Sequence, residues 1–161
     1  MPEMEWVVGI AETKTAMSPD RLLAIGLGSC VAVTVHDCQK KIGGLAHIML
    51  PSSRFHAKAN VKGKYADTAI KAMVEELALK GGEKDRFEAK LVGGANMFST
   101  IIQNPLPIGT RNLMAVREIL VEMKIPITGE DVGGTQGRSL VFNLSDGKIL
   151  VRKINQSDIW I

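Results

Sequence analysis

The sequence predicts a single α/β domain over residues 1–161, with mostly antiparallel strands and two helices packed on one side. Two observations support this prediction. Segments with the apolar alternation of strands recur along the chain, and two other segments show the 3.6-residue periodicity of amphipathic helices. A chain of 161 residues can also bury a core without disulfides.

The expected elements alternate along the chain. Residues 5–12 read as a first strand, and residues 29–36 and 42–50 are expected to pair as a hairpin around the turn at Asp37–Lys40. The apolar stripe of residues 65–80 predicts a helix that Gly81 and Gly82 end, after a polar, loop-like stretch at 51–62. A second helix is expected at 110–124, before Pro126. The remaining expected strands are 87–92, 127–132, 139–143 and 149–154.

Composition narrows the class of protein. Hydrophobic residues make up 45% and charged residues 23% of the chain, as in ordinary globular domains. The net charge of +3 comes from scattered basic residues, and aromatic residues are only 4%, so no nucleic-acid partner is expected. The acidic N-terminal segment does not resemble a signal peptide, and no apolar run reaches the ~18 residues of a membrane span. We therefore expect a cytoplasmic protein without membrane insertion.

The two cysteines, Cys30 and Cys38, do not form a recognisable framework. They are eight residues apart, which matches no paired metal-ligand spacing, and a domain of this size does not need a disulfide. We therefore expect neither a bound metal nor a cofactor.

Cys30 lies at the end of the glycine-rich stretch GLGSCVAV, residues 26–33. A cysteine before an apolar strand can be a small buried hydrophobic residue. It can also be a nucleophile, because Gly28 lets backbone N–H groups approach a substrate and the amides around Ser29 and Cys30 could form an oxyanion hole. Both interpretations remain open on pattern alone.

A nucleophilic thiol needs a base, and the chain has three histidines. His36 lies ~20 Å along the strand from Cys30, too far to reach, and His56 lies in the polar loop. His47 is the remaining candidate, although a histidine in an apolar run can equally be a hydrogen-bonded core residue. If the hairpin turn is centred near residue 39, Cys30 faces Ile48 rather than His47.

A bulge or register shift at Gly43 and Gly44 would make Cys30 and His47 cross-strand neighbours.

Two other glycine clusters can each be interpreted as an anion-binding loop or as a structural turn. Residues 133–138 could be a phosphate loop but lack the GxxxxGK[ST] pattern, so a hairpin connection is expected. Gly93 and Gly94 are expected to form a tight turn rather than an anion site.

A series of short motifs resembles the CheD family, the chemoreceptor glutamine deamidases of bacterial and archaeal chemotaxis. The resemblance extends from about Gly9 to Lys153 and keeps the family's order. Its motifs are Ile25–Val31, Ala46–Pro51, Lys64–Ala69, Ala89–Phe98, Ile108–Asn112, Glu130–Gly134 with Gly137 and Arg138, and Leu150–Lys153.

The resemblance implies a layered α/β/β sandwich that hydrolyses selected receptor glutamine side chains to glutamate and releases ammonia. Cys30 then matches the nucleophile and His47 the base. The implied partners are the cytoplasmic helical bundle of methyl-accepting chemotaxis receptors and the phosphatase CheC, both docking over Cys30. Phe98 would lie at that contact, or alternatively anchor its loop in the core.

One position departs from the family pattern. The family's third catalytic residue is a threonine six positions before the cysteine, and this chain has Ala24 there. Either the backbone carbonyl of Ala24 holds the His47 ring, or catalysis is weak and the protein acts mainly as a binding module that modulates receptors or CheC by contact. A general thiol amidase acting on small molecules is a third hypothesis.

Overall fold

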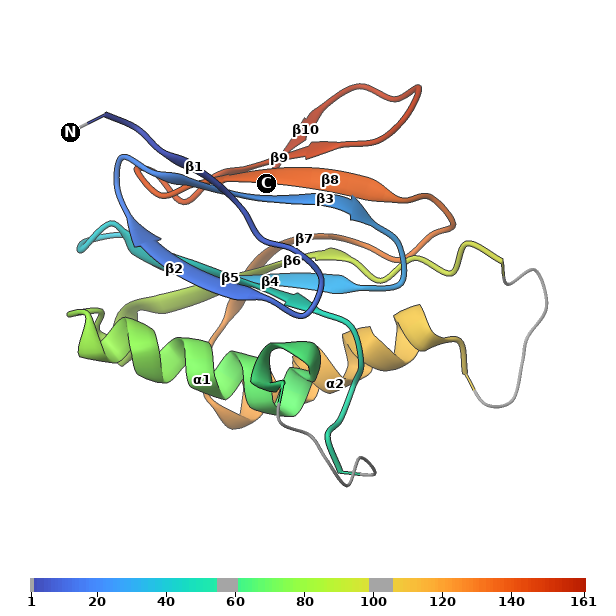
Figure 1. Cartoon of the computed structure of the whole chain (residues 1–161), viewed down its shortest axis with the longest axis horizontal. Helices are drawn as coiled ribbons and strands as arrows, with labels where there is room; N and C mark the ends of the chain where they lie inside the picture. The colour runs from blue at the N-terminus through green and yellow to red at the C-terminus, as the bar shows by residue number, and fades with distance from the viewer. Residues whose placement is uncertain (1, 55–60, 99–105) are drawn as a thin grey trace.

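The structure is a computed structural model that describes residues 2–54, 61–98 and 106–161. It has three layers: an outer sheet, an inner sheet and a pair of helices (Figure 1). The outer sheet has the strand order β1 (Glu5–Val7), β3 (Arg21–Leu27), β8 (Arg138–Asn143), β9 (Ile149–Arg152), β10 (Ile159–Trp160). The inner sheet has the order β2 (Thr13–Met17), β5 (Ile42–Ile48), β4 (Val31–Asp37), β6 (Phe87–Gly93), β7 (Ile127–Val132). The helices are α1 (Ala66–Leu79) and α2 (Ile108–Glu122), with short 3-10 turns at Lys62–Lys64 and Lys84–Arg86.

The layered α/β/β prediction is confirmed. Among the strands that the structure describes, only β1 with β3 and β6 with β7 pair in parallel, and the other neighbours are antiparallel. Both helices lie on the same face of the inner sheet (Figure 1). The inner sheet is therefore covered on both faces, which explains why every residue of β4 and β5 is buried.

Alternation in β4 divides the core into two halves. Val31, Val33 and Val35 pack toward the helices, whereas Ala32 packs with Leu45 of β5 toward the outer sheet. The face of a strand on which a residue lies therefore decides whether it meets the helices or the other sheet.

The predicted first strand at 5–12 is wrong in extent. β1 ends at Val7, and residues 8–12 cross from the outer to the inner sheet. The strands β2, β3 and β10 were not predicted. β3 contains Gly26 at φ +69° and an irregular register between Ala24 and Leu27, which makes the sequence resemble a turn rather than a strand.

The end of β4 distant from Cys30 carries a buried ion pair. Asp37 is fully buried, and its carboxylate accepts hydrogen bonds from Arg86 and from the backbone N–H of Gln39 and Glu83. Burial alone would raise the pKa of Asp37, but these donors and the Arg86 charge outweigh it and hold that pKa well below its usual range.

Candidate active site

The β4–β5 ladder places Cys30 and His47 on the same face of the inner sheet. Val31 pairs with Ile48 and Ala32 with His47, and the ladder continues regularly to Asp37 and Ile42. Cys30 and His47 are therefore diagonal neighbours, both facing the outer sheet. Of the two possibilities, a bulge or a register shift, the ladder shows no bulge at Gly43 and Gly44, and its whole register is shifted by one residue from the expected pairing. Side chains at these two glycines would clash, because an added Cβ would lie 2.8 Å from Leu144 or Met73.

The His47 ring is buried and held at one nitrogen only. Nδ1 lies 3.1 Å from the carbonyl oxygen of Val8, and a carbonyl can only accept, so Nδ1 carries the proton and donates it. Nε2 is then the nitrogen with the free lone pair. It is buried and has no hydrogen-bond partner in the part of the chain that the structure describes. The ring is thus held in a fixed orientation in which the lone pair of Nε2 is free to accept a proton.

Burial favours the neutral form of both groups. Burial lowers the pKa of His47, although the bond to Val8 and the charge of Glu12 partly oppose this. Burial raises the pKa of the Cys30 thiol, with its own backbone N–H opposing. An ion pair of thiolate and imidazolium is therefore disfavoured before a substrate binds.

The turn before β4 is fixed by bonds to three successive carbonyls. The Gly28 carbonyl accepts from the Ala95 N–H at 2.9 Å, and the Cys30 carbonyl accepts from the Gly94 N–H at 2.8 Å. Between them, the Ser29 carbonyl accepts from Nδ2 of Asn112 at 3.0 Å. With its carbonyl held there, the Ser29–Cys30 peptide directs the Cys30 N–H to the opposite side.

Asn112 is a site residue that sequence reasoning missed. It lies on α2, is fully buried, and its Nδ2 also donates to the Met49 carbonyl at 3.1 Å. The same side chain thus joins the residue before Cys30 to the residue two positions after His47. The available signals were its place in the motif Ile108–Asn112 and its polar side chain on the apolar face of an expected helix.

The loop after β6 also comes very close to the cysteine. Gly93 has φ +111°, and a Cβ there would lie 2.4 Å from the Cys30 carbonyl oxygen. Gly93 is the last residue of β6 and not part of the expected tight turn, and this position needs glycine both for its backbone conformation and for its contact with the cysteine turn.

Two cavities lie beside the turn, one on each side of Met97. One of about 330 Å³ is lined by Ser29, Ala95, Asn96, Met97, Phe98, Pro107 and Ile108. The other, of about 500 Å³, includes Gly28, Met97 and Arg138 in its wall. Met97 approaches Gly28 so closely that a Cβ there would lie 3.0 Å from its sulphur. Phe98 is 96% exposed, so the alternative that it anchors its loop in the core is wrong.

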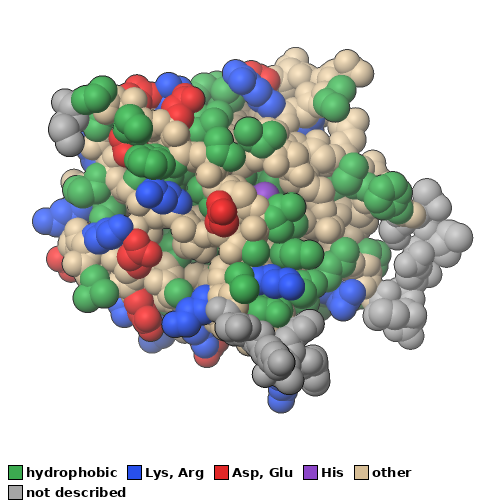
Figure 2. Space-filling view, in the orientation of Figure 1, with side chains coloured by type: hydrophobic (Ala, Val, Ile, Leu, Met, Phe, Trp, Pro, Cys, Tyr) green, Lys and Arg blue, Asp and Glu red, His purple; other side chains and the backbone are tan. Residues whose placement is uncertain are grey.

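Hydrophobic side chains surround this end of the sheets. Charged side chains of both signs mix over β2 and α1, whereas hydrophobic ones gather toward the end of β3 (Figure 2). Ile25 and Met49, which flank the site on β3 and after β5, are 62% and 40% exposed. The surface around the Cys30 turn therefore has an apolar rim.

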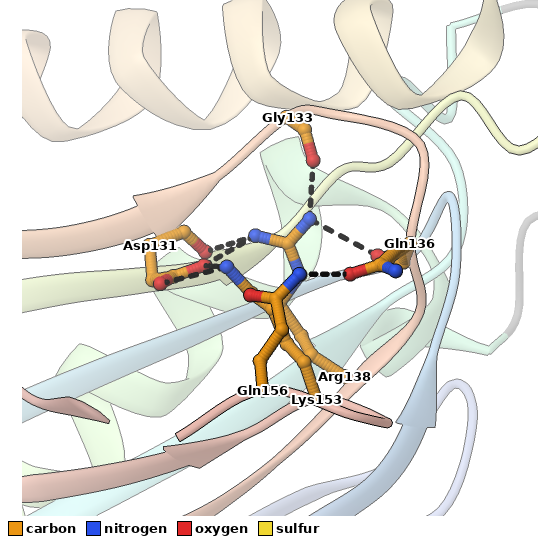
Figure 3. Close-up of polar contacts among 6 residues, drawn as sticks. All are labelled: Asp131, Gly133, Gln136, Arg138, Lys153 and Gln156. Atoms are coloured by element: carbon orange, nitrogen blue, oxygen red, sulfur yellow. Dashed lines mark hydrogen bonds and ion pairs between the residues drawn. The ribbon is translucent and has the colours of Figure 1, made fainter. Parts of the chain in front are cut away.

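Arg138 anchors the segment 133–138, which leads from β7 of the inner sheet to β8 of the outer sheet. Its buried guanidinium donates to the side chain and carbonyl of Asp131 and to the carbonyls of Gly133 and Gln136 (Figure 3). Lys153 also pairs with Asp131. The hairpin expected here is wrong, because the two strands belong to different sheets. Carbonyls rather than N–H groups face the cation, so the loop is not arranged as a phosphate cradle.

The other residues that the sequence analysis considered for the site lie apart from the Cys30–His47 pair or play other roles. Ala24 is fully buried in the core between the sheets, where Cys30 packs, but its carbonyl does not hold His47, because the Val8 carbonyl does. His36 bonds to the Leu144 carbonyl at 3.0 Å, and Cys38 is exposed in its turn. His56 lies outside the described residues.

Within the described residues, no three His, Cys, Asp or Glu side chains gather as metal ligands would. Among the helices described, none is both long and apolar enough to cross a membrane.

Comparisons with known proteins agree on one family. Residues 49–153 match the family model for CheD, described as CheD chemotactic sensory transduction. The probable chemoreceptor glutamine deamidase CheD of Desulforamulus reducens is 47% identical over 91% of this chain and 89% of its own. The chemoreceptor glutamine deamidase CheD of Thermotoga maritima is 45% identical over 94% of this chain and 93% of its own. A probable chemoreceptor glutamine deamidase CheD from Clostridium acetobutylicum is 39% identical over 91% of this chain and 89% of its own. This chain therefore belongs to the CheD family.

Proposed function

We propose that this protein is a chemoreceptor glutamine deamidase in which Cys30 is the nucleophile and His47 the general base. The observation that supports this most directly is the His47 ring, whose Nδ1 is held by Val8. Its buried Nε2, on the face shared with Cys30, has no hydrogen-bond partner among the residues described. A core histidine would ordinarily satisfy both nitrogens. The names of the relatives provide the substrate class, a glutamine side chain of a chemoreceptor.

The reaction proceeds in two halves. As the amide enters the site, Nε2 of His47 takes the thiol proton and the Cys30 sulphur attacks the amide carbon. The imidazolium returns that proton to the departing nitrogen, which leaves as ammonia. Water then attacks the resulting thioester with His47 again as base, and glutamate and the free thiol are formed. Because both groups begin neutral, proton transfer accompanies the attack.

The negative oxygen formed in each half needs hydrogen-bond donors. The Cys30 N–H is directed away from Asn112, and it lowers the pKa of the Cys30 thiol against the effect of burial. The turn that includes Gly28 and Ser29 is held rigid by its three carbonyls. These amides are our candidates for the oxyanion hole.

Mass spectrometry of a receptor cytoplasmic fragment tests the proposal directly. Wild-type protein should add about one dalton per modified site, because OH replaces NH2, and Cys30→Ala should add none. Cys38→Ala is the matched control and should keep the wild-type rate, since Cys38 is exposed in a distant turn. Unchanged activity in Cys30→Ala would refute the thiol mechanism. Binding of the fragment by wild-type protein without any mass shift would favour a binding module instead.

We further propose that receptors and CheC both dock at the apolar rim beside Cys30. Both would present a helix, and an apolar helix face fits exposed Phe98, Met97 and Met49 around the cavity of about 330 Å³. A ligand helix lying there would place one side chain in the cavity next to Ser29. CheC should therefore inhibit deamidation by competition.

Phe98→Ala tests this docking surface by calorimetric titration. Loss of an aromatic anchor should weaken binding of receptor and of CheC by about 2 kcal/mol, roughly thirtyfold. Leu79→Ala, at the end of α1 and 89% exposed, is the matched control and should bind normally. Equal affinities for wild type and a folded Phe98→Ala protein would exclude Phe98 from the contact.

A further inference from the structure

The carbonyl and the N–H of the Val8–Gly9 peptide are both hydrogen-bonded to side chains, and these two bonds link Glu12 to His47. The carbonyl oxygen of Val8 accepts from Nδ1 of His47 at 3.1 Å. The N–H of the same peptide, on Gly9, donates to Oε2 of Glu12 at 2.7 Å. In a trans peptide these two groups point in opposite directions, so a carboxylate holding the N–H fixes the direction of the carbonyl.

We propose that Glu12 is a positioning residue for His47, acting through the Val8–Gly9 peptide in place of a side chain that contacts the ring. The arrangement is a carboxylate, a peptide and an imidazole in series. The first bond polarises the peptide and makes its carbonyl a better acceptor for the second. Glu12 thereby holds the ring in the form with Nδ1 protonated and Nε2 available. This role rests on the proposed function of His47 as a base.

The backbone around Glu12 is fastened to His47 itself. The His47 N–H donates to the Glu12 carbonyl, and the Ala11 N–H donates to the His47 carbonyl, both at 3.0 Å. The Glu12 N–H closes the turn on the Gly9 carbonyl at 3.0 Å. Carboxylate and imidazole are therefore kept in a fixed relation by three further bonds.

Two residues of the turn have conformations or contacts that suit this arrangement. At Gly9, an added Cβ would lie 3.0 Å from Oε2 of Glu12, so glycine leaves room for the carboxylate. Ala11 has φ +66°, which a side chain disfavours and which bends the chain back toward β5. The Glu12 charge also raises the pKa of His47 against the effect of burial.

The test measures the His47 ring and catalysis separately. Nitrogen NMR of labelled protein should show His47 neutral with Nδ1 protonated, with His47→Gln used to assign its signals. Glu12→Ala should move the ring toward the form with Nε2 protonated and lower kcat for deamidation by roughly tenfold to a hundredfold, with KM little changed. Glu75→Ala, an exposed glutamate on α1, is the control for removing a surface carboxylate.

Glu12→Gln separates the hydrogen bond from the charge. Its amide oxygen can still accept from the Gly9 N–H, so the ring should keep Nδ1 protonated and kcat should stay within about threefold of wild type. An unchanged His47 tautomer in Glu12→Ala would overturn the proposal, and so would a Glu12→Gln protein as impaired as Glu12→Ala. The NMR result does not depend on receptor deamidation, so it also distinguishes failure of this inference from failure of the proposed function.

Discussion

Ala24→Thr would restore the hydroxyl that the family pattern has at this position, and the structure predicts little catalytic gain from it. His47 already donates from Nδ1 to the Val8 carbonyl, so a hydroxyl has no vacant role in orienting the ring. Ala24 is fully buried between the sheets, where an added methyl and hydroxyl overfill the core. We expect the variant to lose about 1–3 kcal/mol of unfolding free energy and to deamidate within about threefold of wild type.

Ala24→Val is the matched control, because valine has nearly the shape of threonine without the hydroxyl. Urea unfolding gives the cost of the added volume, and the difference between the two variants gives the contribution of the hydroxyl. Single-turnover deamidation of one receptor fragment compares the chemical steps. A gain of tenfold or more in Ala24→Thr but not Ala24→Val, about 1.4 kcal/mol of transition-state stabilisation, would refute the argument that the Val8 carbonyl suffices.

Three further predictions concern the site and the distant end of β4. Asn112→Leu should lower unfolding free energy by about 2–4 kcal/mol in urea titrations and kcat by more than about tenfold, because two half-buried carbonyls lose the donor that a buried side chain supplies and the cysteine turn is released; an unchanged kcat would contradict this role. Burial lowers the pKa of His47 from 6.5, so the acid limb of the kcat/KM profile should lie below pH 6.5, and an acid limb above pH 6.5 would contradict the neutral pair. Burial also raises the pKa of Cys30 from 9.0, so at neutral pH iodoacetamide should label Cys30 more slowly than exposed Cys38. Asp37→Asn should lower the free energy of unfolding by about 2 kcal/mol at pH 7 without changing deamidation. The lowered pKa means that Asp37 stabilises the fold only when ionised, so this loss of stability should shrink as the pH falls below 3.8. A loss that is constant with pH would show that the Asp37 charge is not its cause.

Local patterns were sufficient for much of the fold. Both helices were predicted within two residues at each end, because their apolar stripes are set by neighbours in sequence. The β4–β5 hairpin was predicted too, with a register one residue off, since Ile48 faces Val31 and not Cys30. One residue decides which side chains share a face, so the one-residue shift in register puts Cys30 and His47 on the same face of the sheet without a bulge.

The parts of the site that could not be predicted come from distant segments. Val8, Glu12 and Asn112 reach the site because the chain crosses between sheets at residues 8–12 and because α2 packs over the cysteine turn. The contacts of Val8 and Glu12 leave no local pattern in the sequence. Val8 acts through its backbone carbonyl, which any residue type could supply, so only the three-dimensional arrangement identifies it.

The crossing at residues 8–12 also explains how a site can work with alanine at position 24. Val8 donates its N–H to the Leu23 carbonyl of the outer sheet and offers its own carbonyl to His47 of the inner sheet. The acceptor for the imidazole is thus fixed by the pairing of both sheets rather than by the rotamer of one side chain. A peptide held in this way loses no side-chain entropy when it orients the ring. The identity of residue 24 then matters for packing between the sheets, and the residues that hold the base are those that fix the Val8–Gly9 peptide.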